Sequence, residues 1–540
     1  MTRITRRGRS RWIAVGALAA TAALVLSACG GGGGGGGDQA QTVSVEWGEP
    51  ENPLIPGNTT EQNGGDVLEA MFTGLVSYDD NTAQPSNAQA DSITTTDNRT
   101  FTIRIKPNWT FHDGSPVTAQ SYVDAWNWTA YGPNAAQGQS FMEKIEGYEA
   151  VSSEQPTAQT MTGLRVVDPL TFAVTLKTPF TIFPTTLGYS SYYPLPQKFF
   201  ADRAGYEAAP VGDGPYRFEA RTPNQNLTLT RYDQYAGSDK GQVQRIEFRV
   251  YDNLQTAYDD VVSGNLDQVR QIPDAPQAGN RWRTDLGAGA KQKPSLVTQA
   301  LTIPVYDPRL ANPLLHKALS MAIDRQAITA QIFNGSRTPA DGYATKTTPG
   351  YVPNQCGEFC TFNPTRAKEL LAQAGGFTGP LTLTANSDGG HDVWMQAVAN
   401  QLRQNLGIDA QYTPVPSFSE QRRLANAKQL TGLARAGWQA DYPSTESFLT
   451  QLYRTGGSSN DSGYANPAFD AALDQADAAP NQQAAEAGYA NAERIVLNDM
   501  PAIPLWSQDI QYGDSRRLAN AERNPLNRLD ASSLQLAPQG

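Results

Sequence analysis

An alternation of strand and helix patterns in the carboxyl-terminal half of the chain constrains the fold more than any other feature. Strand, helix, strand, helix and strand are predicted in turn at Leu381–Ala385, Val393–Leu406, Ile408–Val415, Ser419–Gln429 and Leu433–Ala440. The first of these helices ends at a glycine, Gly407, as helices often do. This order of elements is typical of a largely parallel sheet covered by helices, so the sequence predicts an α/β fold here.

The last of these strands continues into Ala434–Pro443, a run whose side chains alternate between two faces. One face carries Arg435, Gly437, Gln439 and Asp441, and the other carries Ala436, Trp438, Ala440 and Tyr442. A base and an acid therefore lie at opposite ends of one face, with a glycine between them that lets another backbone approach. Such a strand can receive an extended peptide, whose main chain pairs with it while the charges meet the peptide termini. An ordinary buried strand closed by a turn is the alternative interpretation.

The character of the predicted helices changes near Leu296, beyond which they are longer and richer in alanine. Before that point a strand is predicted at Thr42–Trp47, and Thr118 is a candidate N-cap for a helix. A linker-like stretch is predicted at Pro273–Pro294, and one long helix at Leu314–Phe333. With 540 residues, the chain is expected to hold two or three domains.

The amino terminus has the pattern of a secretion signal. Five arginines precede an apolar run from Trp12 to Leu26, which is too short for a typical membrane-spanning helix. The run closes with Leu26-Ser27-Ala28-Cys29, which resembles a bacterial lipobox and predicts a lipoprotein signal peptide at 1–28 and lipidation of Cys29. Residues 29–41 then form a tether, whose glycine run Gly30–Gly37 reaches about 15 Å. A plain secretory signal with a chance cysteine is the alternative, and both place the chain outside the cytoplasm.

The other two cysteines, Cys356 and Cys360, are expected to form a disulfide, because cysteine pairs outside the cytoplasm are usually oxidised. A zinc site would need two further ligands, and the three histidines of the chain supply none nearby. We therefore expect neither a metal site nor a cofactor.

Charge and motif content argue against several classes of function. The formal net charge is −11 and the first 28 residues hold five positive charges, so the remainder carries −11 − 5 = −16. Nucleic acid is therefore not an expected partner. The sequence contains no Gly-x-Ser-x-Gly elbow, no His-Glu-x-x-His helix and no Walker loop. We expect no catalytic residues, and a binding protein rather than an enzyme.

Taken in order, the motifs resemble the peptide and nickel class (family 5) of extracytoplasmic solute-binding proteins that serve ABC importers, and most closely its oligopeptide-binding lipoproteins. The similarity extends over essentially the whole mature chain. Besides the lipobox, it is carried by Trp109-x-Phe111-His112-Asp113-Gly114-x-Pro116-Val117-Thr118-Ala119, Gly212-x-Gly214-Pro215-Tyr216, Ala318-Leu319-x-x-Ala322-Ile323-Asp324-Arg325, and Gly437-Trp438-x-x-Asp441-Tyr442 followed by Ser447-Phe448-Leu449.

The resemblance implies a periplasmic-binding-protein-like fold of class II with three lobes, two of which close over a central ligand cleft. Lobe I is expected to be discontinuous, at 42–83, 206–298 and 508–540. Lobe II, a small extra lobe, is expected at 84–205, and lobe III at 299–507. The change in helix length and alanine content near Leu296 agrees with the boundary between 206–298 and 299–507.

The resemblance also implies roles for individual residues. In similar oligopeptide binders the aspartate after Gly-Trp-x-x holds the ligand's α-ammonium, and that position here is Asp441. The arginine two residues before the glycine, Arg435, can meet a carboxylate, and the backbone at Gly437–Gln439 pairs with the peptide. The remaining candidate ligand-binding residues are Trp438 and Tyr442 and, from lobe I, Asn58 and Thr59. The Asp-Pro that members often show after the tyrosine is replaced here by Pro443-Ser444-Thr445-Glu446.

The sequence therefore predicts a monomeric, lipid-anchored receptor on the outer face of the cell membrane. It would bind short peptides between two lobes and deliver them to the permease subunits of an ABC importer. Within the same fold, the alternatives are an oligosaccharide, a metal chelate or haem as the solute. Outside it, a secreted hydrolase is the less favoured alternative.

Overall fold

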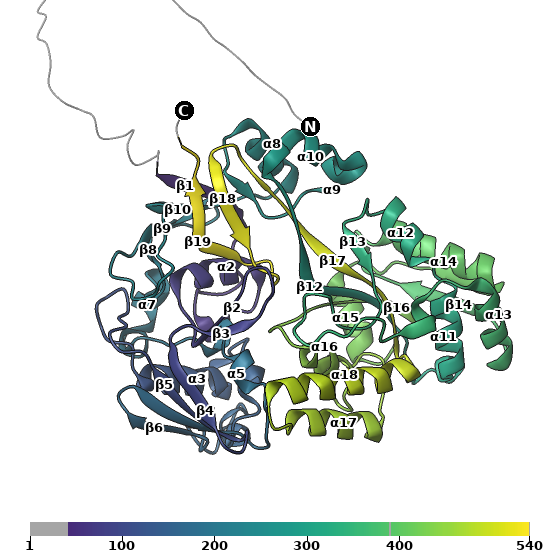
Figure 1. The fold of residues 1–540 in the computed structure, drawn as a ribbon, viewed down its shortest axis with the longest axis horizontal. Helices are drawn as coiled ribbons and strands as arrows, with labels where there is room; N and C mark the ends of the chain where they lie inside the picture. The colour runs from purple at the N-terminus through teal and green to yellow at the C-terminus, as the bar shows by residue number, and fades with distance from the viewer. Residues whose placement is uncertain (1–40, 388–389, 539–540) are drawn as a thin grey trace, which may run out of the picture. The chain divides into compact units, whose positions relative to one another are not determined.

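Two long strands of 13 residues each, β12 (Ala290–Thr302) and β17 (Ala502–Asp514), form the middle of an 11-stranded sheet. They are shown in Figure 1, a computed structural model that describes residues 41–387 and 390–538. The sheet order is β15-β14-β16-β12-β17-β11-β1-β10-β9-β8, and β13 pairs with β17. The predicted signal peptide, Cys29 and the glycine run lie outside the described residues.

On one side of the β12–β17 pair, the sheet is built around β1 (Thr42–Trp47), which matches the predicted strand and pairs in parallel with β10. Val43, Val45 and Trp47 are fully buried. They pack with α2 and with the strands that follow β10 in the sheet. The elements of this part are α2 (Gln62–Met71), β8 (Tyr216–Thr222), β9 (Asn226–Arg231), β10 (Arg245–Val250), α8 (Leu254–Ser263), β11 (Gln268–Val269), α9 (Asp274–Gln277) and α10 (Arg281–Leu286).

Two short hairpins complete this part of the structure. The strands β18 (Leu518–Arg523) and β19 (Leu529–Leu536) pair with each other, and β19 packs on α2. The strands β2 (Val76–Tyr78) and β3 (Pro85–Asn87) form a second antiparallel pair. Figure 1 shows β18 and β19 in yellow beside purple α2, so the last residues of the chain lie next to some of the first described ones.

A separate four-stranded antiparallel sheet, of order β4-β5-β7-β6, is formed within residues 84–205. Helix α3 packs on it, and Thr118 accepts a hydrogen bond from the Ser121 amide, so the predicted N-cap is confirmed. The elements here are β4 (Ala90–Thr95), β5 (Thr100–Ile105), α3 (Ala119–Ala130), α4 (Tyr148–Val151), β6 (Leu164–Asp168), β7 (Thr171–Thr175), α5 (Phe183–Thr186), α6 (Gln197–Ala201) and α7 (Arg203–Ala208).

On the other side of the β12–β17 pair, β14 pairs in parallel with both β15 and β16, as the alternation of strands and helices predicts. The sheet is mixed rather than largely parallel, because β12, β13 and β17 all run antiparallel to their neighbours. The elements are α11 (Pro313–Met321), α12 (Arg325–Gln331), β13 (Arg337–Pro339), α13 (Pro364–Gln373), β14 (Pro380–Thr384), α14 (Asp392–Leu406), β15 (Asp409–Tyr412), α15 (Phe418–Asn426), β16 (Gly432–Gln439), α16 (Glu446–Tyr453), α17 (Pro467–Asp477) and α18 (Gln482–Asp499).

Two of the predicted elements are wrong. The helix predicted over Leu314–Phe333 is two helices, α11 and α12, because the chain breaks after Ala322 and the Asp324 carboxylate caps α12 by accepting from the Ala327 amide. The stretch predicted as a linker at Pro273–Pro294 contains α9, α10 and the first residues of β12.

Candidate functional site

Strand β16 has a neighbour on both edges only along its first half. Its residues Gly432–Ala434 pair in parallel with β14, whereas on the other edge Ala434–Gln439 pair with β12. Among the described strands, none pairs with residues 435–439 on the β14 side. The second half of β16 is therefore an open strand edge inside the sheet.

The direction of the main-chain groups on this open edge follows from the pairing with β12. The Ala440 amide donates to the carbonyl oxygen of Leu296, at 3.0 Å, which continues the β12 register. Because alternate residues of a strand direct their N–H and C=O groups to opposite edges, those of Gly437 and Gln439 face the open edge. The carbonyl oxygen of Arg435 also faces that edge, where it accepts from the Gln421 side chain at 2.6 Å. The sequence places Gly437–Gln439 as the backbone template, and in the structure the main-chain groups of Gly437 and Gln439 that face the open edge pair with no described strand.

Asp441 lies just beyond the end of β16. Its backbone amide donates to Ser447 Oγ, at 3.2 Å, while its carboxylate accepts no hydrogen bond and forms no ion pair with any described residue. Burial and, to a smaller extent, the nearby Glu446 carboxylate raise the pKa of the Asp441 carboxyl to about 7, although Arg528 lowers it in part. Asp441 is thus a partly buried acid that lacks a donor of its own.

Arg435, near the other end of the open edge, also lacks a partner of opposite charge. Its Nε donates to the side-chain oxygen of Gln299, at 3.4 Å, and no described carboxylate lies within ion-pair distance. Burial lowers the pKa of the guanidinium. A ligand carboxylate at Arg435 would therefore meet a cation that has no ion-pair partner. In the same way, a ligand ammonium at Asp441 would meet an anion that has none.

A cavity of about 310 Å³ opens beside the first half of this edge, and we call it the Arg435 cavity. It extends along residues 435–438 but not along 439–441. Its walls also come from β12, from the loop before α13, from α15 and α16, and from β17. Apart from the β16 residues, they include Thr298, Gln299, Ala300, Ala340, Tyr343, Phe418, Gln421, Arg422, Phe448, Leu452, Tyr453, Asp461, Pro504 and Trp506.

Asp441 lines two smaller cavities. The Asp441 cavity, of about 190 Å³, is bounded by residues near both ends of the described chain, among them Thr60, Gln62, Glu69, Tyr189 and Arg528. The second, of about 160 Å³, lies between Asp441, Trp438 and the Tyr192 region. Because Trp438 also lines the Arg435 cavity, the three cavities follow one another along the strand edge.

The other candidate residues of this stretch have partners of their own. The Gln439 side chain donates to the carbonyl oxygen of Leu526, at 3.0 Å. The Tyr442 hydroxyl donates to the Glu446 carboxylate, so Tyr442 orients an acid that raises the pKa of Asp441. The indole N–H of Trp438 is buried and has no hydrogen-bond partner among the described residues.

The two candidates from the first part of the chain, Asn58 and Thr59, line none of these cavities. The Asn58 side-chain oxygen accepts from the Gln137 amide at 3.1 Å, and the Thr59 hydroxyl donates to the carbonyl oxygen of Pro53 at 3.1 Å. Their neighbours Thr60 and Gln62 reach the Asp441 cavity instead. The predicted loop approaches the site, but with the residues that follow the predicted ones.

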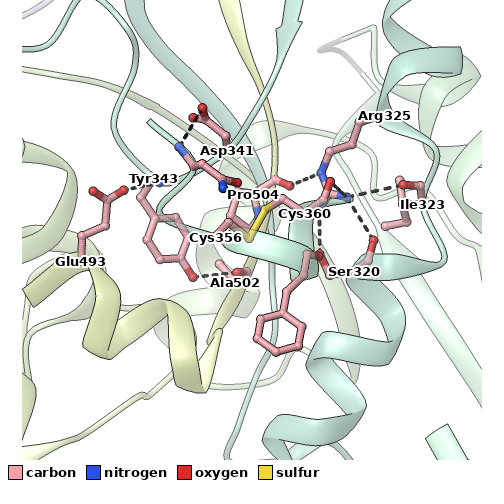
Figure 2. Close-up of a disulfide and its surroundings, with 12 residues drawn as sticks. Ser320, Ile323, Arg325, Asp341, Tyr343, Cys356, Cys360, Glu493, Ala502 and Pro504 are labelled. Atoms are coloured by element: carbon pink, nitrogen blue, oxygen red, sulfur yellow. Dashed lines mark hydrogen bonds between the residues drawn. A yellow bond between two sulfur atoms is a disulfide. The ribbon is translucent and has the colours of Figure 1, made fainter. Parts of the chain in front are cut away.

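The back wall of the Arg435 cavity is held by a buried polar cluster, shown in Figure 2. The Glu493 carboxylate accepts from the amides of Tyr343 and Ala344, at 2.6 and 3.1 Å, and the Tyr343 hydroxyl donates to the carbonyl oxygen of Ala502 at 2.7 Å. Burial raises the pKa of the Glu493 carboxyl to about 7. The ring of Tyr343 is thereby fixed with its hydroxyl bonded to β17.

Arg325 connects the same wall to the cysteine pair. In the structure Cys356 and Cys360 are joined by a disulfide (Figure 2). The Arg325 guanidinium is 3% exposed and donates to the carbonyl oxygens of Pro504, Ser320 and Cys360, at 2.7, 3.0 and 3.3 Å. Because Pro504 lines the cavity, the Ala-Ile-Asp-Arg motif supports the cavity wall through Arg325.

Residues from 84–205 also contact the α17–α18 region. The Thr181 amide donates to the carbonyl oxygen of Asp477 at 2.8 Å, and the Asn98 side chain donates to that of Ala479 at 2.7 Å. Lys144 Nζ lies 3.5 Å from the Asp477 carboxylate. Residues of 84–205 also line the cavities at Asp441, whereas α17 and α18 do not.

Two of the sequence motifs contact each other away from these cavities. His112 accepts from the Gly212 amide at 3.2 Å through Nδ1, and its Nε2 lies 3.0 Å from the carbonyl oxygen of Gly214. Burial lowers the pKa of His112 to about 4, so the ring is neutral at physiological pH. His112 thus connects two turns, which is the role expected beside Asp-Gly.

The described residues give no sign of two other kinds of site. Within 41–387 and 390–538, no three His, Cys, Asp or Glu side chains are arranged to hold a metal ion. Over the same ranges, no helix combines the length and the hydrophobicity needed to cross a bilayer.

An α/β fold with an open strand edge and cavities between distant parts of the chain is an arrangement that can enclose a small solute. The model of the bacterial extracellular solute-binding proteins, family 5, matches residues 84–460, more than two thirds of the chain. The chain belongs to this family, which confirms the resemblance found in the sequence and the predicted fold class.

Curated relatives are similar over most of their length. The oligopeptide-binding protein OppA of Bacillus subtilis is 26% identical over 486 residues, which cover 84% of this chain and 86% of the relative. The periplasmic oligopeptide-binding protein OppA of Salmonella typhimurium is 27% identical over 523 residues, 94% of each chain. The periplasmic murein peptide-binding protein MppA of Escherichia coli is 26% identical over 469 residues, 83% of this chain and 84% of the relative.

Solved structures share the fold. The unliganded open form of the murein tripeptide binding protein MppA has a TM-score of 0.79 at 23% identity, covering 92% of this chain and 97% of that one. The substrate binding protein CtaP of Listeria monocytogenes has a TM-score of 0.78 at 19% identity, covering 92% and 99%.

Several residues that line the cavities were missed by sequence analysis. They come from distant parts of the chain. The additional residues are Thr60, Gln62, Glu69, Arg528, Phe418, Tyr343, Tyr453 and Trp506. The large exposed apolar side chain of Phe418, at the start of α15, is the one signal that could have indicated a contact surface.

Proposed function

We propose that this protein is a receptor that binds short peptides in extended conformation and delivers them to an ABC importer. The observation that carries the proposal is the Asp441 carboxylate, which is partly buried, has no donor among the described residues, and lies at the end of an open strand edge. The α-ammonium of a peptide would supply the missing donor. The names of the curated relatives, which are oligopeptide- and murein peptide-binding proteins, support the same choice of solute.

The two ends of the open edge would fix the direction of the peptide. With its ammonium at Asp441 and its carboxylate toward Arg435, the peptide runs antiparallel to β16, and its main chain pairs with Gly437 and Gln439. Six residues separate Arg435 from Asp441, which is at most about 20 Å of extended chain. This recognition uses groups that every peptide has, so it suits a receptor for many sequences.

The cavities would be enclosed by movement between lobes. We propose lobe I at 42–83, 206–298 and 508–540, lobe II at 84–205, and lobe III at 299–507. The β12–β17 register shifts between Pro294 and Val297, next to the proposed boundary between lobes I and III, which supports bending at that point. The contacts of Thr181, Asn98 and Lys144 with the α17–α18 region would then stabilise the closed state.

We propose that the receptor acts at the outer face of the cell membrane as a monomer, anchored by lipid on Cys29. The lipobox-like sequence before Cys29 and the glycine tether after it support this arrangement. Permease subunits of an ABC importer would be the partners that accept the peptide. Expression of the full chain with Cys29→Ala should move the protein from the membrane fraction to the soluble fraction.

The function is tested by calorimetry with the tripeptide Ala-Ala-Ala, which has both termini and no large side chain. We expect saturable binding, and recovery of the tripeptide unchanged by mass spectrometry after incubation. Native mass spectrometry of protein purified from cells should also show co-purified peptide. Absence of binding to any unmodified peptide, or cleavage of the tripeptide, would contradict the proposal.

A further inference from the structure

We infer that the Arg435 cavity selects peptides with a bulky apolar side chain, and an aromatic one above all, at the third residue from the amino end. This inference rests on the proposed function and adds the class of side chain that the site prefers. It differs from recognition of the main chain and termini alone, which would accept every side chain equally.

The walls of the cavity present mostly carbon. The rings of Tyr343 and Tyr453 pack at a tilt with centroids 4.5 Å apart, and the buried side chains of Phe448 and Trp506 also line the cavity. The Tyr343 hydroxyl is bonded to the carbonyl oxygen of Ala502, so the ring offers its carbon atoms to the cavity. An apolar side chain placed against such a wall gains from leaving water, whereas a charged one loses its hydration.

The charged groups of the cavity offer no site for an ionic side chain. Arg422 and Asp461 form an ion pair with each other, at 2.5 Å. Arg435 has no described carboxylate partner and is the group proposed to meet the peptide carboxylate. An acidic side chain would compete with that carboxylate for Arg435, and a basic side chain would meet two arginines and one paired aspartate.

Phe418 indicates where an apolar ligand group would be covered. Its side chain is 49% exposed, which is unusual for so large an apolar residue, and it also lines the cavity. The other large hydrophobic side chains that are exposed in the described chain line none of the three cavities along β16; they are Val167, Phe200, Val262, Val352, Phe362 and Val393. An aromatic group in the cavity would remove water from Phe418.

Strand spacing gives the position in the peptide. In an antiparallel pairing that starts with the ammonium at Asp441, the first peptide residue lies opposite Gln439, the second opposite Trp438 and the third opposite Gly437. The cavity is lined by residues 435–438 and not by 439–441. Trp438 also lines the cavity, but its indole occupies the space opposite the second residue, whereas Gly437 has no side chain, so the third residue is the first with room for a side chain at the cavity.

The inference is tested by calorimetry with four tripeptides: Ala-Ala-Ala, Phe-Ala-Ala, Ala-Phe-Ala and Ala-Ala-Phe. We expect Ala-Ala-Phe to bind roughly 10- to 100-fold more tightly than Ala-Ala-Ala, as burial of one phenylalanine side chain provides. Phenylalanine at the first or second position should change affinity by less than about threefold. Equal binding of all four peptides, or a preference at another position, would overturn the inference while leaving peptide binding established. Absence of binding to all four would instead contradict the proposed function.

The variant Phe418→Ser tests the wall directly. It should weaken Ala-Ala-Phe roughly 3- to 10-fold more than it weakens Ala-Ala-Ala, because Ala-Ala-Ala has no large side chain to cover. The matched control is Val393→Ser, another exposed apolar residue, 67% exposed and outside the cavities, which should affect neither peptide. An equal loss for both peptides, or an unchanged preference for Ala-Ala-Phe in Phe418→Ser, would overturn the role of this cavity. Thermal melts of both variants verify folding, which half-exposed positions tolerate.

Discussion

The two ends of the open edge of β16 are built differently. At one end Asp441 has a carboxylate that no described side chain or amide satisfies, between two small cavities. At the other end Arg435 is hydrogen-bonded to Gln299 and lies beside a larger cavity with aromatic walls. The acid end suits a group that is the same in every peptide. The arginine end has room for a group that varies, so in the proposed function recognition of the terminus and selection of the side chain would be separated along one strand.

Comparison with other buried acids shows what is particular to Asp441. Burial also raises the carboxyl pKa of Glu493 and of Asp213 to about 7. Glu493 accepts from two backbone amides, and Asp213 accepts from the Gln89 side chain and the Thr73 amide. Those two acids hold the structure together. A raised pKa alone therefore does not distinguish Asp441 from these two acids, whereas the missing donor does.

The largest expected effect is at the acid end. Asp441→Asn keeps the shape of the side chain and removes its charge, so the peptide ammonium loses its only proposed counter-ion in a buried site. Affinity for Ala-Ala-Ala should fall by about 2–5 kcal/mol, measured by calorimetry. Glu154→Gln, which neutralises an exposed carboxylate in another part of the chain, is the control and should bind as the unmodified protein does. Unchanged affinity in Asp441→Asn would show that Asp441 does not bind the peptide ammonium.

The pH dependence of binding tests the role of Asp441 in a second way. In the ligand-free protein the pKa of Asp441 is raised to about 7, and contact with an ammonium lowers it in the complex. Below pH 7 binding must therefore release a proton, so affinity falls as the pH falls. Between pH 7.5 and 5.5 the loss should be about 20-fold, provided that the bound carboxyl stays ionised. Asp441→Asn should flatten the profile, and a profile that keeps its slope in this variant would assign the titration to another group, such as Glu446.

The residues in these predictions could be identified from the sequence because the pattern that indicates them lies within one short stretch of the chain. The strand β16, its alternation and the residue that follows it were predicted from neighbouring residues, and the structure gives β16 at Gly432–Gln439. The two wrong predictions concern stretches where the pattern of neighbouring residues does not match the structure. The apolar spacing continues across the break between α11 and α12, and the glycines and prolines of 273–294 hide a helix whose Trp282 and Leu286 are buried.

The walls of the cavities could not be predicted in the same way, because they depend on contacts between distant residues. Arg528 and Gln62 meet Asp441 from opposite ends of the described chain. Thr60 and Gln62 line the Asp441 cavity, whereas Asn58 and Thr59 contact other parts of the chain. The chain turns into helix α2 at Gln62, directly after these residues. Sequence pattern identifies the strand that is proposed to receive a ligand, and only the fold identifies the surfaces opposite it.

At the arginine end we expect a smaller effect. Arg435→Gln should weaken a tripeptide with a free carboxylate by about tenfold, because a charged hydrogen bond is lost while water still reaches the wider cavity. The same tripeptide with an amidated carboxyl end should bind the unmodified protein about tenfold less tightly, and the variant should not distinguish the two peptides. A variant that still prefers the free acid would show that the carboxylate lies elsewhere, and it would leave Asp441 as the single charged contact of the peptide main chain.

The smallest expected effect lies between the two ends, at Gly437, and it tests whether the peptide pairs with the strand at all. Gly437→Pro removes an N–H that faces the open edge and takes no part in the pairing with β12, so the fold should tolerate it. Gly437→Ala is the control, because its Cβ displaces the flexible Arg435 side chain, whose Nη2 lies 2.4 Å from the Cβ position, but leaves the N–H in place. Relative to this control, proline should weaken Ala-Ala-Ala by about fivefold, as loss of one hydrogen bond predicts. If the two variants bind alike, the peptide is held by its termini and does not extend the sheet.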